Sequence, residues 1–268
     1  MHAEMTLRKE IGALSSNQVK DCSSNVHHCG GNGGCQGSTS ELAYDYIVKN
    51  GVSLEADYGG DKNHDEKCGN IKPYIKIGGF QPLPTNKLQP LMDAVTTKGP
   101  VVVSIDASGW NSYGGGVFAV ATVFRSFRLR PQPETAKNCT TMDSSGAGRK
   151  GTELGVVARL ENTYCWEDTC NRDSVVNHAV VLIGYGHSTE HNKDYWYIRN
   201  SWGEAWGENG FIRLQRHSSD QGDAGYCGVD HNPKEGTGCD NGPPTIPVCG
   251  MCGVLSDSVY PYDLQLWK

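Results

Sequence analysis

The chain has 268 residues, with 24 Lys and Arg residues against 30 Asp and Glu residues, which gives a formal net charge of −6. This acidic balance argues against nucleic-acid binding, because contacts with phosphate groups require a basic surface. No apolar stretch approaches the roughly 20 residues that a membrane-spanning helix needs, so neither a nucleic-acid partner nor a membrane span is predicted.

The first part of the sequence carries helical patterns. Residues 1–21 show a weak helical pattern and lack the apolar core of a secretory signal. A Gly- and Cys-rich loop follows at residues 27–37, and Ser38 with Glu41 then forms a capping-box pattern for a second helix. Gly51 is the expected end of that helix. Its apolar residues fall on one face: Leu42, Ala43, Tyr46 and Ile47.

After residue 70 the pattern changes to short strands with one further helix. Residues 88–95 have helical spacing, provided that Pro90 lies in the first turn. Strands are predicted at residues 74–77, 101–106, 179–183, 195–198 and 211–214. A helical part followed by a β-rich part predicts an α+β protein with two subdomains, and a functional site in the cleft between them.

Residues 119–163 fit neither pattern. They combine Ser, Thr, Gly and Pro with scattered basic side chains, and a loop of this length without structure of its own is uncommon in a compact domain. We interpret the segment as an atypical insertion: a functional insertion, a disordered loop or retained intron sequence, with retained or spurious sequence favoured over a functional lid. It contains the glycosylation sequon Asn138-Cys139-Thr140.

The eleven cysteines predict disulfides formed in an oxidising compartment. Because the number is odd, one thiol is free or has its partner outside the chain. Such cysteines without a secretory signal predict that the N-terminus is missing. Cys249 and Cys252 could form half a zinc site, with His27, His28 and Cys29 as distant ligands. A single pair of this spacing is weak evidence, so disulfides are favoured and no metal or cofactor is predicted.

Two motifs carry residue types suited to catalysis. His178 lies at the mouth of an apolar strand, and Asn200 follows a second strand 22 residues later. If the strands bring them together, the Asn amide oxygen can accept a hydrogen bond from one imidazole nitrogen and fix the ring. The other nitrogen can then take a proton from a nucleophile as a general base. A lone His at a strand end is usually structural, but its combination with an Asn-Ser-Trp-Gly string favours catalysis.

These blocks resemble papain-like, cathepsin-type cysteine peptidases, and the Asn-Ser-Trp-Gly string followed by Trp206 is specific to them. The similar segments, in the family's order, are residues 19–22, 34–37, 99–101, 177–186 and 197–210. The resemblance implies a two-lobed fold. Residues 1–70 would form a partial helical left lobe. Residues 71–268 would form a β-barrel right lobe with the insertion and a Cys/Gly/Pro-rich C-terminal extension.

By this resemblance the chain belongs to cysteine-type peptidases, which hydrolyse peptide bonds by a Cys-His-Asn mechanism. His178 would be the general base, Asn200 would orient it, and Trp202 would shield their hydrogen bond from water. The residues implied in substrate binding are Gly34, Gly37, Ser38, Asn177 and Trp202. Ser38 departs from the family, which usually has a second Gly there, so its pairing with the substrate backbone is expected to differ. Cys22 would pair with Cys68.

The resemblance further implies peptide or protein substrates, a monomer, and a lysosomal, vacuolar or secreted location. Cys29 could pair with Cys35 or bond elsewhere. The family partner of Cys35 lies just before the nucleophile.

The nucleophile itself is where the sequence departs most from the family, whose Cys-Trp-type block lies about 130–150 residues before the His and Asn. Counting back from His178 reaches Cys29 and Cys35, but both lie in the Gly-rich loop rather than at a helix N-terminus, where a thiol pKa is lowered. Without the insertion the expected position is about residue 3 or earlier, and residues 1–21 contain no Cys.

We therefore expect the chain to begin just after the nucleophile, without the oxyanion-hole Gln and the propeptide, and to be inactive alone. Apolar surface is expected where the missing helix would pack between the lobes. The alternative is a non-catalytic protein of papain fold that binds peptides or partners.

Overall fold

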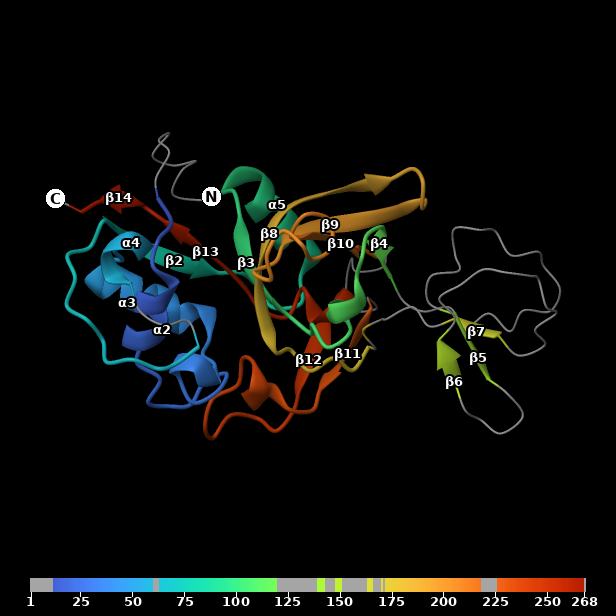
Figure 1. Cartoon of the computed structure of the whole chain (residues 1–268), viewed down its shortest axis with the longest axis horizontal. Helices are drawn as coiled ribbons and strands as arrows, with labels where there is room; N and C mark the ends of the chain where they lie inside the picture. Colours follow the sequence, from blue (N-terminus) through green and yellow to red (C-terminus); the bar gives the residue numbers. More distant parts are fainter. Residues whose placement is uncertain are drawn as a thin grey trace.

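The structure is a computed structural model. It describes residues 12–59, 63–119, 139–142, 148–150, 163–165, 170, 172–217 and 226–267. Helices α2, α3 and α4 gather in one part of the molecule, and α5 lies beside the large sheet in the other part (Figure 1), which is the α+β, two-lobed arrangement expected from the sequence. Among these residues, no helix is both long enough and apolar enough to cross a membrane.

The helical lobe is small. Its elements are α2 (Ser16–Cys22), the turn η1 (Gly34–Gln36), α3 (Ser40–Asn50) and α4 (Glu55–Tyr58). The main helix, α3, begins after Thr39, whose hydroxyl accepts a hydrogen bond from the amide of Leu42 at 3.5 Å. The predicted capping by Ser38 is therefore wrong by one residue, because Thr39 satisfies the first-turn amide instead. The predicted stop at Gly51 is confirmed by its φ of 70°, which glycine adopts without strain.

The apolar face of α3 is only partly covered. None of the residues of this helix is fully buried, although a face of this kind normally packs against a neighbouring element. A small core lies beside it, formed by Val52, Ile75, Ile77 and Leu264. This core combines side chains from both sides of residue 70, where the sequence places the boundary between the lobes. That boundary stays a prediction.

The second lobe is built around a seven-stranded sheet with the order β2-β13-β3-β8-β9-β10-β4. Its strands are β2 (Gly79–Pro82), β3 (Val101–Ile105), β4 (Val117–Phe118), β8 (His178–Ser188), β9 (Lys193–Arg199), β10 (Phe211–Gln215) and β13 (Ser258–Tyr262). Neighbouring strands are antiparallel except for β10 and β4, which are parallel.

The strands predicted in this sheet are confirmed, but β8 is longer than expected. It runs through Gly184 and Gly186, which weaken a local strand pattern, to Ser188. The antiparallel pairing with β9 continues to Ser188 opposite Lys193, so the partner strand maintains the extended backbone that the local sequence alone does not predict.

Smaller elements complete the lobe. They are α5 (Leu88–Thr97), η2 (Trp110–Ser112), η5 (Pro233–Glu235), η6 (Met251–Gly253), and the strand pairs β1 (Ile75–Lys76) with β14 (Gln265–Leu266) and β11 (Cys227–Asp230) with β12 (Ile246–Cys249). The predicted helix at residues 88–95 is confirmed as α5. Pro90 is its third residue, in the first turn, where no amide donor is needed.

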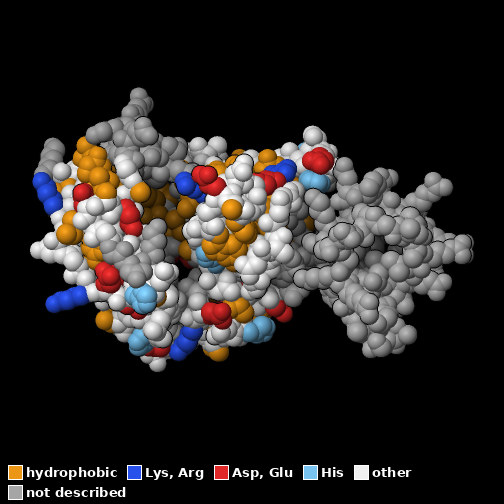
Figure 2. All heavy atoms as spheres, in the orientation of Figure 1, with side chains coloured by type: hydrophobic (Ala, Val, Ile, Leu, Met, Phe, Trp, Pro, Cys, Tyr) orange, Lys and Arg blue, Asp and Glu red, His pale blue; other side chains and the backbone are white. Residues whose placement is uncertain are grey.

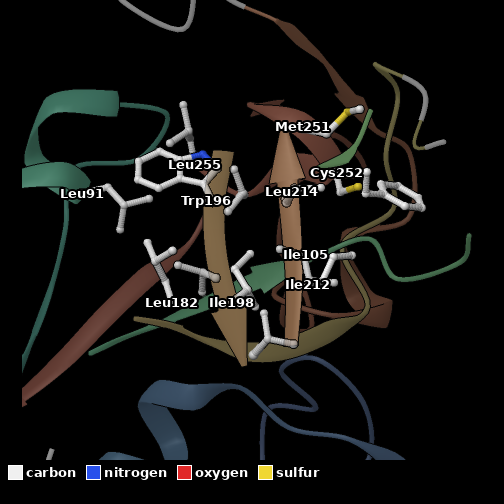
Figure 3. Packing of buried hydrophobic residues seen from close by; sticks show 14 of the residues in the cluster. Leu91, Ile105, Leu182, Trp196, Ile198, Ile212, Leu214, Met251, Cys252 and Leu255 are labelled. Carbon is white, nitrogen blue, oxygen red and sulfur yellow. The ribbon is translucent and has the colours of Figure 1, made fainter. Parts of the chain in front are cut away.

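The main core lies against the seven-stranded sheet. Alternate side chains of its strands point to the same side (Figure 3), as the two-residue period of a strand requires. Trp196 and Ile198 come from β9, and Ile212 and Leu214 come from β10. All four are fully buried.

Within the expected insertion and at its C-terminal end, the structure describes three short strands. They are β5 (Cys139–Met142), β6 (Gly148–Lys150) and β7 (Thr163–Cys165), which form an antiparallel sheet in the order β6-β5-β7. The segment that we expected to lack structure therefore has a small sheet. Strands of three or four residues are too short to produce a readable period. Asn138 of the sequon lies outside the described residues.

Disulfides connect most of the described cysteines. The pairs are Cys22–Cys68, Cys29–Cys239, Cys170–Cys252 and Cys227–Cys249, and Cys35 is a free, exposed thiol. Because Cys249 and Cys252 are each bonded to another sulfur, neither can act as a thiolate zinc ligand. Of the two possibilities for Cys29, the structure shows a partner other than Cys35, and this bond joins the two lobes.

Glu41 and Asp257 form a carboxyl pair between the lobes, and we expect this pair to make the folded protein more stable at low pH than at neutral pH. Burial, followed by the nearby carboxylate of Asp257, raises the pKa of Glu41 to about 7. Asp257 also accepts a hydrogen bond from the hydroxyl of Ser104 at 2.6 Å. Because the folded-state pKa of Glu41 lies above its unfolded value, its stabilising contribution is complete at low pH and is lost as the pH rises through about 7.

We expect the urea midpoint of unfolding to fall between pH 5 and pH 8, and to fall less in the Glu41→Gln variant. The amide of Gln stays neutral across this range, so the comparison isolates the contribution of Glu41. An equal fall in both proteins would show that the pair does not contribute.

Candidate active site

His178 and Asn200 lie side by side in the structure. His178 is the first residue of β8, and Asn200 directly follows the last residue of β9. Since these strands are antiparallel neighbours, the start of one lies beside the end of the other. The imidazole Nε2 of His178 is 2.9 Å from the amide Oδ1 of Asn200. The arrangement that the sequence predicted for this pair is therefore present.

The environment of Asn200 determines which atoms of the pair donate. Asn200 is buried, its backbone amide donates to the carbonyl of Gly210 at 2.9 Å, and its Oδ1 accepts from the amide of Ser201 at 2.8 Å. Because Oδ1 acts as an acceptor, the proton of the contact with His178 belongs to Nε2. The other nitrogen, Nδ1, has no hydrogen-bond partner among the described residues, and in the neutral ring it is a base.

A cluster of aromatic rings lies against His178. The ring of Trp202 lies 5.2 Å from that of His178, measured between centroids, and packs edge-on against Trp206 at 5.2 Å. Trp206 in turn stacks on Trp110, and its indole nitrogen donates to the Trp110 carbonyl at 3.0 Å. Trp202 remains 38% exposed, so part of its ring stays accessible while the rest packs against His178 and Trp206. That Trp202 shields the His–Asn hydrogen bond from water stays a prediction.

A cavity of about 200 Å³ lies between the helical lobe and β8. Gly34 and Ser38, two of the predicted substrate-binding residues, line it on one side, and Ala179, the neighbour of His178, lines it on the other. Figure 2 shows a hollow between the two lobes with hydrophobic side chains inside it. Sequence reasoning missed Thr39, which also lines this cavity. Its position at the start of α3 was the only available signal.

Three predicted substrate-binding residues do not line this cavity: Trp202, which packs against His178, and Gly37 and Asn177. Gly37 is in the Gly-rich loop, where its carbonyl accepts a hydrogen bond from the amide of Gly33 at 2.8 Å. Asn177 precedes His178, and its side-chain oxygen accepts from the amide of Ala107 at 3.1 Å. Neither residue lines the cavity, so the structure brings only part of the predicted set together.

No described cysteine has the properties of a nucleophile. Cys29 is bonded to Cys239. Cys35 is free, but partial desolvation, followed by the Asp65 carboxylate that accepts its backbone amide proton at 2.5 Å, raises the pKa of its thiol. A nucleophilic cysteine needs the opposite shift, because the thiolate is the reactive form. The side chains of Cys139 and Cys165 lie outside the described set.

Comparison with known proteins gives a consistent result. Residues 2–128 and 160–237 match the family described as papain family cysteine protease. The chain is 31% identical over 224 residues to the thiol protease SEN102 of a Hemerocallis species and 33% identical over 227 residues to the oryzain beta chain of Oryza sativa subsp. japonica. These matches cover 82% of the chain in both cases, but 46% and 36% of the two relatives. The chain thus spans less than half the length of these relatives.

Solved structures resemble the fold as well. The digestive procathepsin L 3 from the larval midgut of Tenebrio molitor has a TM-score of 0.58 and 25% identity, covering 97% of this chain and 59% of that one. The bromelain protease of Ananas comosus, in complex with the E64 inhibitor, has a TM-score of 0.55 and 25% identity, covering 94% of this chain and 79% of that one.

Proposed function

The chain belongs to the papain family of cysteine proteases, and we propose that its His178–Asn200 pair serves the hydrolysis of peptide bonds by a cysteine thiolate. The observation that carries the proposal is the 2.9 Å contact between Nε2 of His178 and Oδ1 of Asn200, because it leaves Nδ1 available as a base. The substrates are peptides or proteins, the protein acts as a monomer, and it works in a lysosome, a vacuole or outside the cell.

In the proposed mechanism, Nδ1 of His178 takes the proton of a cysteine thiol and leaves a thiolate beside an imidazolium. The thiolate attacks the carbonyl carbon of the peptide, and the imidazolium then protonates the departing amine. His178, again neutral, takes a proton from water, whose oxygen attacks the thioester carbonyl and releases the carboxylic acid. The departing thiolate then takes the proton back from the imidazolium, which restores the thiol and the neutral ring. Asn200 holds the ring in one orientation throughout, and Trp202 limits the access of water to their hydrogen bond.

The nucleophile of this mechanism comes from a segment other than residues 1–268, so the chain alone binds peptides without cleaving them. The disulfide of Cys29 and the raised pKa of Cys35 support this view. Such a segment also accounts for the incompletely covered apolar face of α3 and the cavity beside it, because a further helix would fill this space.

The test uses the purified chain, a fluorogenic peptide and a reducing agent. We expect no turnover above that of the His178→Ala variant, and measurable binding of the peptide by both. Thiol-dependent turnover that is lost in His178→Ala would show that a cysteine within residues 1–268 is the nucleophile. Binding without turnover, even after addition of the upstream sequence read from the full-length transcript, would favour the non-catalytic peptide-binding protein.

A further inference from the structure

The connection between β11 and β12 crosses from one lobe to the other. This connection, residues 231–245, is called the strap here. In Figure 1 it is the orange-red segment that runs along the lower edge of the molecule toward the blue lobe. The two strands that it joins are paired directly, with Asp230 opposite Ile246. A two-residue turn could therefore join them, so the length of the strap is not required by the sheet.

A disulfide and backbone hydrogen bonds attach the strap to the helical lobe. The disulfide between Cys29 and Cys239 joins residues 210 positions apart in sequence. Next to it, the amide of Gly30 donates to the carbonyl of Gly238 at 2.9 Å, and the amide of Asp240 donates to the carbonyl of His27 at 2.8 Å.

Charged side chains add to this attachment. Asp240 lies 2.6 Å from Nδ1 of His28 and 3.3 Å from the ammonium group of Lys234, and these two neighbours hold the pKa of its carboxyl below the usual range. All three side chains are exposed, so the disulfide rather than the charges fixes the position of the strap.

On the other lobe, the strap contacts the residues that lead into His178. Asp230, at its base, is fully buried and accepts a hydrogen bond from the amide of Val176 at 3.1 Å. The backbone of Gly236 lies so close to the Val176 carbonyl that a Cβ on Gly236 would overlap it and would lie 3.2 Å from the amide nitrogen of Asn177. The strap therefore reaches within two residues of the proposed general base.

Gly236 also contacts the Gly-rich loop. A Cβ on Gly30 would overlap the carbonyl of Gly236 and would lie 3.3 Å from the carbonyl carbon of Ser38. Separate backbone segments therefore contact one another in series. Ser38, which lines the cavity, lies against Gly30, Gly30 lies against Gly236, and Gly236 lies against the segment before His178. No other described connection between the lobes is closed by a disulfide in this way.

We propose that the strap closes one end of the peptide-binding cleft, so that the site takes the end of a peptide or a short peptide, not the middle of a long chain. The inference rests on the proposed function. A backbone held covalently between the two walls cannot move aside for a passing chain, whereas an ordinary surface loop can. Extension of a bound peptide on the strap side brings it against main-chain atoms of Gly236, and extension on the opposite side does not.

The experiment measures the affinity of the full chain for two series of labelled peptides, one lengthened residue by residue at the N-terminus and one at the C-terminus. In one series we expect the affinity to fall by about tenfold beyond a limiting length, and in the other to stay level or rise. The fall should disappear in a variant that joins Asp230 to Ile246 through Asn-Gly and carries Cys29→Ala, and it should be smaller in Cys29→Ala/Cys239→Ala.

The matched control is Cys227→Ala/Cys249→Ala, which removes a disulfide at the base of the strap and keeps the link between the lobes. This variant should retain the full length limit. The proposal is overturned if native chain and strap-deleted variant show the same dependence on length. If neither protein binds any peptide, the proposed function fails together with the strap's role. If only the variants without the Cys29–Cys239 bond bind peptides, the strap blocks the cleft completely, and the proposal that the native site takes the end of a peptide is overturned.

Discussion

Replacement of His178 by Ala, in the chain preceded by a nucleophile-bearing segment, is expected to lower kcat/KM for a peptide substrate by about 10⁴-fold. The imidazole takes the thiol proton and returns it to the leaving amine, so both proton transfers lose their catalyst. Ala makes no contact with Asn200, and the affinity for the peptide should change little. Stopped-flow or steady-state assays with a fluorogenic peptide provide the measurement.

The control for this prediction is His187→Ala. His187 belongs to the same strand, β8, but its Nδ1 lies 2.8 Å from a carboxylate oxygen of Asp194 and its side chain is exposed. Loss of a surface pair of this kind changes stability by at most about 1 kcal/mol, so kcat/KM should remain within about twofold of the unmodified enzyme. A comparable loss in both variants would show that the assay reports damage to β8 and not the removal of a general base.

Replacement of Ile198 by Ala is expected to lower the free energy of unfolding by about 2–5 kcal/mol. Ile198 is fully buried in β9, opposite Leu182 of β8 and Ile212 of β10, in a core whose packing is shown in Figure 3. Removal of three carbon atoms leaves a cavity that surrounding strands cannot fill, because their backbones are held by hydrogen bonds on both sides. Urea denaturation monitored by Trp fluorescence measures the change.

The Ile198→Val variant tests the same position with a smaller deletion and should cost about 0.5–1.5 kcal/mol. Because Ile198 lies two residues before Asn200, the distinction between stability and function matters here. Ile198→Val should leave the peptide affinity unchanged at a temperature where it is fully folded. Equal destabilisation by both substitutions would indicate that the protein collapses around this site and that the core is less tightly packed than its burial implies.

Much of the β-rich lobe could be predicted from the sequence. The strands at residues 195–198 and 211–214 repeat apolar side chains with the period of two that a half-buried strand requires, and the structure has β9 and β10 there. The helix at residues 88–95 was equally readable, because Gly99-Pro100 marks its end. The small sheet formed by β5, β6 and β7 could not be predicted, since its short strands depend on each other and not on a local pattern.

The sequence predicted the side of the candidate site that carries His178 and Asn200 better than the side formed by the helical lobe. His178 and Asn200 flank neighbouring strands of an antiparallel pair, so their approach follows once β8 and β9 are assigned. The helical side depends on loops, where Thr39 replaces Ser38 as the cap and Gly37 and Asn177 lie outside the cavity. Backbone geometry in a Gly-rich loop is set by contacts with distant segments, which a local sequence pattern does not encode.

The sequence by itself determined the fold class, the strands β3, β8, β9 and β10 of the large sheet and the His–Asn pair, because periodicity and a specific motif are local properties of the chain. Only the tertiary structure decided the partner of Cys29. Eleven cysteines permit many pairings, and nothing local relates Cys29 to Cys239 at a separation of 210 residues. That bond, and with it the path of the strap between the lobes, exists because folding brings the Gly-rich loop and the β11–β12 connection to the same place.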